Sequence, residues 1–131
     1  MAMNRTTMVK REKGMEQCIT DNMDCHSICM ETTMYCLMKG GKYADPKLMR
    51  MMRDCSEMCQ TTANFMLRES PMCTRMCSMC AEMCMECAEM CEQFKNDKMM
   101  MSCADVCRKC ATSCEKMADM PMEKMAMAQM A

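Results

Sequence analysis

Apolar and sulfur-bearing residues recur at alternating steps of three and four along most of this 131-residue chain. Positions spaced in this way lie on one face of an α-helix. Three breaks interrupt the pattern, and they are marked by four turn or capping pairs, Gly40-Gly41 and Asp45-Pro46 at the first, Ser70-Pro71 at the second and Asn96-Asp97 at the third. Between the breaks β-branched residues are scarce, which argues against strands. The pattern therefore predicts four helices, at about residues 15–39, 46–68, 71–95 and 98–118.

The connections between these four segments are only a few residues long. Short connections join antiparallel neighbours, so we expect an all-α, up-down-up-down four-helix bundle over residues 15–118. We interpret the whole chain, 1–131, as a single domain. Residues 1–14 would form an N-terminal arm or a short extra helix, and residues 119–131 a methionine-rich tail.

Cysteine occupies most inward-facing positions of the predicted bundle, where leucine and isoleucine are usual. In the third segment the steps between cysteines are 4, 3, 4, 3 and 4, and in the fourth they are 4, 3 and 4. The first segment has four cysteines, with Asn22 and Thr32 or Thr33 in the gaps, and the second has only two. The sixteen candidate metal ligands are Cys18, Cys25, Cys29, Cys36, Cys55, Cys59, Cys73, Cys77, Cys80, Cys84, Cys87, Cys91, Cys103, Cys107, Cys110 and Cys114.

Composition excludes several classes of function. The chain has 16 cysteines and 28 methionines but only nine Leu, Ile, Val and Phe residues. A net charge of −1, no tryptophan and four Tyr and Phe residues argue against a nucleic-acid-binding protein. No run of 18 apolar residues occurs, so we expect no membrane span. The first eleven residues lack the apolar core of an export signal, and we therefore expect a cytoplasmic protein.

Packing and disulfide bonds explain the cysteines poorly. Cysteine offers less apolar area than leucine, so a core of sixteen would lose stability with nothing in return unless it binds something. Disulfides along one helix would be strained, because Cβ atoms at these spacings lie about 5–6 Å apart and a disulfide needs about 3.8 Å. Geometry leaves disulfides between facing helices open, but a reducing cytosol favours free thiols.

Among metals, Cu(I) fits the donor set best. Three Cys-x2-Cys pairs favour zinc, but they lie within helices rather than on tight turns. The chain has no iron–sulfur run, and a single histidine excludes a di-iron bundle. Soft thiolate and thioether ligands select Cu(I). Each Cu(I) that replaces a thiol proton leaves the core's charge unchanged, whereas an isolated four-thiolate zinc site buries two negative charges. Many equivalent ligands without a distinct acid, base or open position predict storage and not an enzyme.

The stripes Cys73 to Cys91 and Cys103 to Cys114 on bundled helices resemble the bacterial copper storage proteins. The resemblance covers roughly residues 15–118, and the lack of a leader resembles the cytosolic branch of that family. It implies a homotetramer of four-helix bundles whose cores fill with Cu(I) thiolate clusters. This sequence departs from the family in its two-cysteine second segment and its abundance of methionine.

Five further residues are candidates for auxiliary or uptake ligands: His26, Met38, Met52, Met100 and Met117. We expect copper to enter where the second and fourth helices begin, because Met52 and Met100 continue the cysteine stripes there. Two alternatives stay open at this stage. One is sequestration of zinc or soft metals in general, and the other is a thiol redox buffer that uses reversible disulfides.

Overall fold

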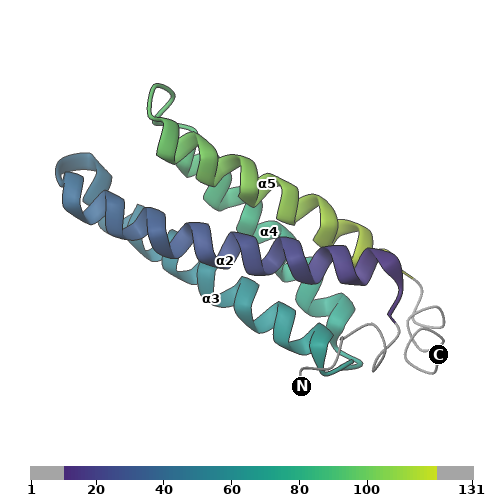
Figure 1. Cartoon of the computed structure of the whole chain (residues 1–131). Coiled ribbons are helices and arrows are strands. Elements are labelled where there is room, and N and C mark those ends of the chain that lie inside the picture. The colour runs from purple at the N-terminus through teal and green to yellow at the C-terminus, as the bar shows by residue number, and fades with distance from the viewer. Residues whose placement is uncertain (1–10, 121–131) are drawn as a thin grey trace, which may run out of the picture.

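The computed structural model describes residues 11–120, and these form four α-helices and one short 3₁₀-helix (Figure 1). No strand occurs among these residues, so the predicted all-α class is confirmed. Expectations for residues 1–10 and 121–131, which include most of the N-terminal arm and of the tail, lie outside the described residues. The elements are α2 (Lys13–Lys39), η1 (Gly41–Ala44), α3 (Pro46–Leu67), α4 (Cys73–Cys91) and α5 (Lys98–Ala118).

The helix ends follow from local capping chemistry. The Asp45 carboxylate accepts hydrogen bonds from the backbone N–H groups of Lys47 and Leu48, and Pro46 occupies the first position of α3. Asp97 caps α5 in the same way by accepting from the N–H of Met100. Gly40, with φ of 71°, ends α2 and donates its N–H to the Cys36 carbonyl. These caps confirm three of the four predicted turn or capping pairs.

The third helix is shorter than predicted at both ends. It spans Cys73–Cys91 and not 71–95, because Ser70 and Pro71 form a turn in which Ser70 Oγ accepts from the Met72 N–H. After Cys91 the chain turns, and the Phe94 ring packs 4.4 Å from the Tyr43 ring, centroid to centroid. Tyr43 belongs to η1, an element that the periodicity did not predict because it is only four residues long.

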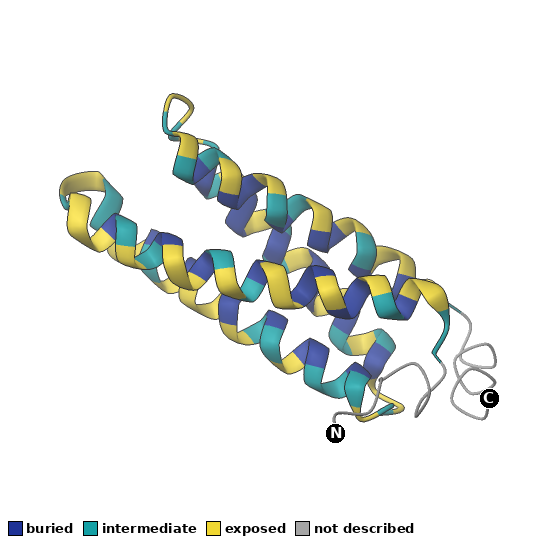
Figure 2. Cartoon of the chain, viewed as in Figure 1, coloured by how far each residue is buried: buried dark blue, intermediate teal, exposed yellow. Residues whose placement is uncertain are grey.

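Each helix packs against two neighbours. α2 contacts α3 and α5, and α4 contacts the same two helices, so all four surround one axis. Figure 2 shows buried residues on the inward faces and exposed residues on the outside. The largest fully buried side chains are five methionines, with Met15, Met66 and Met117 towards one end of the bundle and Met52 and Met100 towards the other. The interior between them consists mostly of cysteine, with several alanines and the buried polar residues Asn22, Thr32 and Thr62.

Within residues 11–120, no helix combines the length and the hydrophobicity needed to cross a membrane.

Candidate metal centre

All sixteen predicted cysteines lie in the interior with no exposed surface, and none forms a disulfide. The alternating steps of three and four hold them on the face of each helix that points to the bundle axis. The predicted inward position of all sixteen thiols therefore agrees with the structure, and their role as metal ligands stays a prediction. Which thiols approach one another depends on how the four helices are offset along the axis.

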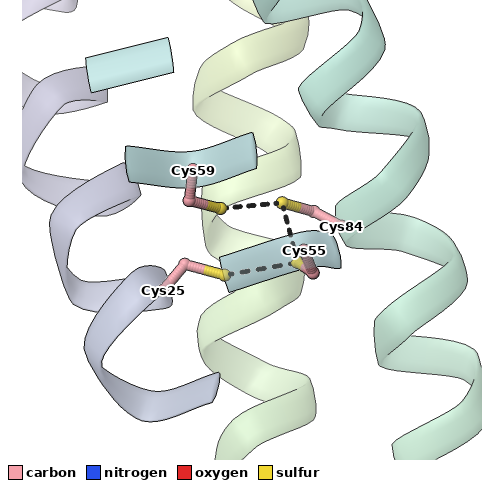
Figure 3. Close-up of side chains that lie close together, drawn as sticks. All are labelled: Cys25, Cys55, Cys59 and Cys84. Carbon is pink, nitrogen blue, oxygen red and sulfur yellow. Dashed lines mark hydrogen bonds between the residues drawn. The ribbon is translucent and has the colours of Figure 1, made fainter. Parts of the chain in front are cut away.

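The centre of the bundle brings four thiols from three helices together (Figure 3). Cys25 of α2, Cys55 and Cys59 of α3, and Cys84 of α4 have sulfur atoms that all lie within 4.8 Å of one another. The Sγ atoms of Cys59 and Cys84 are 3.6 Å apart, and those of Cys55 and Cys84 are 3.8 Å apart. We call this group the central tetrad.

Two flanking tetrads overlap the central one. The first consists of Cys25, Cys29, Cys55 and Cys107, and the second of Cys59, Cys80, Cys84 and Cys110. The central tetrad shares two sulfurs with each of them, so the three tetrads form one continuous array of eight thiols. A sulfur that belongs to two groups can bridge metal ions in both.

Asn22 connects this array to a further group of three thiols, Cys18, Cys77 and Cys114. Its Nδ2 lies 3.4 Å from Cys18 Sγ and 3.3 Å from Cys114 Sγ, and its Oδ1 accepts a hydrogen bond of 3.1 Å from Cys80 Sγ. Sequence reasoning treated Asn22 only as a residue in a gap of the stripe. A polar residue at an inward position of the cysteine stripe was the signal in the sequence that Asn22 contacts thiols.

The remaining thiols extend the array towards both ends. Cys29 Sγ lies 4.0 Å from Cys103 Sγ, and Cys36 donates a 3.5 Å hydrogen bond to the thioether sulfur of Met100. At the opposite end, Cys73 donates to the carbonyl oxygen of Phe65 over 3.4 Å. Two inward positions carry threonines, Thr32 and Thr62, whose buried hydroxyls have no hydrogen-bond partner within residues 11–120.

Protonation of the empty array is governed by burial and by thiol–thiol contacts. Burial, followed by the charge of Cys103, raises the pKa of Cys36 to about 11. Contact with the Cys110 thiol, and then with other thiols and burial, raises the pKa of Cys59. Contact with the Cys107 thiol, and then with the Cys110 and Cys29 thiols, lowers the pKa of Cys25. Contacts between thiols therefore shift the pKa values of neighbouring buried cysteines in opposite directions.

The auxiliary candidates occupy three different environments. Met52, Met100 and Met117 are buried, and Met38 is 85% exposed. His26 belongs to none of the ligand groups in the described part of the chain. Its Nδ1 lies 2.9 Å from the carbonyl oxygen and 3.0 Å from the Oγ of Ser56, so the ring joins α2 to α3 beside the array.

The fold and the site together define a four-helix bundle lined with soft ligands that can hold several metal ions. Residues 11–119 match the sequence profile of the copper storage protein family, and the chain therefore belongs to that family. No curated protein sequence matches it.

Solved structures agree with this assignment. The Nmul_A1745 protein of Nitrosospira multiformis is 39% identical, with a TM-score of 0.77 over 81% of this chain and 95% of that chain. The Cu(I)-bound copper storage protein BsCsp3, from Bacillus subtilis, is 27% identical, with a TM-score of 0.76 over 81% and 99%. Ccsp from Streptomyces lividans, loaded with 10 copper equivalents, is 25% identical, with a TM-score of 0.75 over 81% and 84%.

Proposed function

We propose that this protein stores many Cu(I) ions as cargo in thiolate clusters inside its bundle, and that it is not an enzyme. The observation that carries the proposal is the sharing of sulfurs among the three tetrads. A shared thiolate bridges two ions, so sixteen sulfurs can hold between about eight ions with private ligand pairs and about sixteen with full bridging.

The same overlap disfavours zinc as the main cargo. Structural zinc uses four private ligands, and only the two flanking tetrads have no sulfur in common. They offer room for two zinc ions, each of which would leave two buried negative charges. Cu(I) in a bridged lattice replaces one thiol proton per ion and adds no charge to the interior.

Anaerobic titration of the reduced protein with Cu(I), in competition with a chromogenic Cu(I) chelator, tests this proposal. We expect the chelator to stay empty until between about eight and somewhat above sixteen equivalents have been added. Saturation at four or fewer equivalents would contradict it, and tight uptake of only two zinc ions in a parallel titration would favour zinc.

The redox-buffer alternative is tested on the same sample. Facing sulfurs lie as close as 3.6 Å, as between Cys25 and Cys107, so reversible disulfides between helices are a real competitor. A redox buffer would lose its free thiols under mild peroxide while its helical circular dichroism is retained. A storage protein should be protected from this oxidation when copper occupies the thiols.

We further propose that copper enters at the end where α3 and α5 begin. Met52 and Met100 are buried in line with the cysteines there, and Met100 already contacts Cys36. Thioethers bind Cu(I) more weakly than thiolates do and need no deprotonation, so they can pass an ion inward. Replacing both residues by leucine should slow loading and leave the final capacity unchanged. Unchanged rates would assign these methionines to packing alone.

Self-association and a cytoplasmic location complete the proposal. Met30 and Met34 are more than half exposed on the outer face of α2, beside Leu37 and Met38. Flexible thioethers suit a surface that packs against copies of itself. Sedimentation of the wild type should give a tetramer, and Met30→Glu with Met34→Glu should give smaller species. Cell fractionation tests the location, and recovery outside the cytoplasm would contradict it.

A further inference from the structure

A hollow of ≈ 520 Å³ lies at the end of the bundle where we place copper uptake. Two regions that are distant in sequence form it: the end of α2 with the adjoining 3₁₀-helix η1, and the turn between α4 and α5. Its walls include Lys39, Lys42, Tyr43, Phe94, Lys95 and Asp97. A hollow of this volume is in the range of small-molecule sites.

The hollow is positively charged. The Nζ atom of Lys39 lies 5.5 Å from the Tyr43 ring centroid, and that of Lys42 lies 5.7 Å from the Phe94 centroid. These cation–π contacts hold the two ammonium groups at the rim. Within residues 11–120, neither they nor Lys95 form an ion pair with a carboxylate.

The carboxylate in the wall is already engaged. Asp97 accepts hydrogen bonds from the hydroxyls of Tyr35 and Tyr43, at 2.6 Å and 2.8 Å, and caps α5. These donors offset its charge and fix its position. The three lysines are therefore left to attract an anion from solution.

The hollow is also connected to the sulfur array. Asp97 Oδ1 accepts from the backbone N–H of Met100 at 3.1 Å, and Met100 Sδ lies 3.5 Å from Cys36 Sγ. A ligand held in the hollow therefore lies against Asp97, which caps the first turn of α5. That turn carries Met100, the outermost sulfur-bearing residue of the α5 stripe at this end.

We propose that this hollow binds a small anionic thiol, with two or more carboxylates, as its Cu(I) complex. The proposal rests on copper storage as the function of the protein. It names the chemical class of the molecule that delivers copper to the protein and takes copper from it. The hollow accommodates a tripeptide-sized molecule, whereas an acidic protein would need an interface of about 800 Å² on this partner. The lysines bind the carboxylates and bring the copper next to Met100 and Cys36.

Transfer is then a ligand exchange in which copper stays Cu(I) and no electron moves. Each Cu–S bond to the carrier that breaks is replaced by a Cu–S bond to a protein cysteine. The proton of that cysteine thiol passes to the released carrier thiolate, so a bis-thiolate complex that meets two protein thiols yields two free carrier thiols. Unloading is the reverse reaction.

Binding is tested on the full-length reduced protein with S-methylglutathione, an anionic probe that cannot exchange thiols. We expect saturable chemical-shift changes at Tyr43, Phe94 and Lys42 in nuclear magnetic resonance spectra. The triple variant Lys39→Gln, Lys42→Gln, Lys95→Gln should weaken binding at least tenfold. The matched control, Lys13→Gln, Lys109→Gln, Lys116→Gln, removes the same charge away from the hollow and should bind as the wild type does. Absence of binding to the wild type would overturn the proposal.

Loading kinetics test delivery. From a Cu(I)–glutathione donor, the hollow variant should load at least tenfold more slowly than the control variant, and added salt should reduce the difference. From a cationic Cu(I)–acetonitrile donor the hollow variant should load no more slowly than the control variant, because the removed lysines repel a cation. Equal slowing with both donors would mean that the substitutions merely damage the mouth, and equal rates with glutathione would also refute the proposal. The final capacity reports separately on storage, so failure of the storage function is distinguishable from failure of this site.

Discussion

Helices α3 and α4 contribute to the array in opposite ways. α4 carries six cysteines, but three of them, Cys73, Cys87 and Cys91, belong to none of the ligand groups found in the described part of the chain. α3 carries only two, Cys55 and Cys59, and each belongs to two tetrads. The helix with the fewest thiols therefore supplies two of the four sulfurs that belong to two tetrads, the others being Cys25 and Cys84. We expect copper capacity to depend on where a sulfur lies as well as on how many there are.

The strongest test removes sulfurs in matched pairs. Cys55→Ala with Cys59→Ala breaks all three tetrads, so copper capacity should fall by clearly more than two ions. Cys73→Ala with Cys91→Ala removes two equally buried thiols from α4 but leaves the tetrads whole, and it should cost about two ions or fewer. Anaerobic titration of both variants, with circular dichroism to check the helices, decides the matter. An equal loss would show that the sulfurs act independently.

The free energy of unfolding should respond to alkaline pH in the empty protein but hardly at all in the copper-loaded protein. The pKa of Cys36 is raised to about 11 by burial, from 9.0, so the folded protein keeps a proton that the unfolded chain loses. The free energy of unfolding of the empty protein should therefore fall as pH rises from about 9 towards 11. Burial also raises the pKa of Cys73 at the end of α4, and this adds in the same direction. Copper-loaded protein has exchanged these protons for metal and should show a nearly flat profile in denaturant titrations.

Adding a sulfur to α3 should reduce the difference between α3 and α4 in the number of core thiols. Thr62 occupies the next inward position after Cys59, and its buried hydroxyl has no partner within residues 11–120. Thr62→Cys is nearly equal in volume and removes an unsatisfied polar group, so capacity should rise by about one ion without loss of stability. Thr61→Cys places a thiol on the adjacent exposed position and serves as the control. An equal gain from both variants would mean that surface thiols account for it.

The smallest effect is expected at His26. Its ring contacts Ser56 and joins α2 to α3 from outside the array. His26→Ala should lower the free energy of unfolding by about 1 kcal/mol, the usual value of a hydrogen bond, and leave copper capacity unchanged. Ser56→Ala should have a similar effect on thermal unfolding. A loss of one or more copper ions in the His26 variant alone would instead make the imidazole a ligand.

Periodicity predicted which residues face the axis but not which of them meet. The steps from Cys73 to Cys91 determine one face of one helix, and this is a local property. The approach of Cys25, Cys59 and Cys84 depends on the axial offset of three helices, which side-chain packing sets. The early end of α4 also escaped prediction, because it depends on Phe94 packing against Tyr43 from a different part of the chain. The lysine-lined hollow was missed for the same reason.

The five buried methionines at the two ends of the bundle have a consequence for its design. They divide the interior into two ends, which supply its bulkiest side chains, and a repetitive middle section that is rich in thiols. A repetitive section can be lengthened without altering its ends. Inserting seven residues into each helix would extend every one by about 10.5 Å, or two turns, and keep each stripe in phase. Copper capacity would then increase with the length of the middle section, while the two ends stay unchanged.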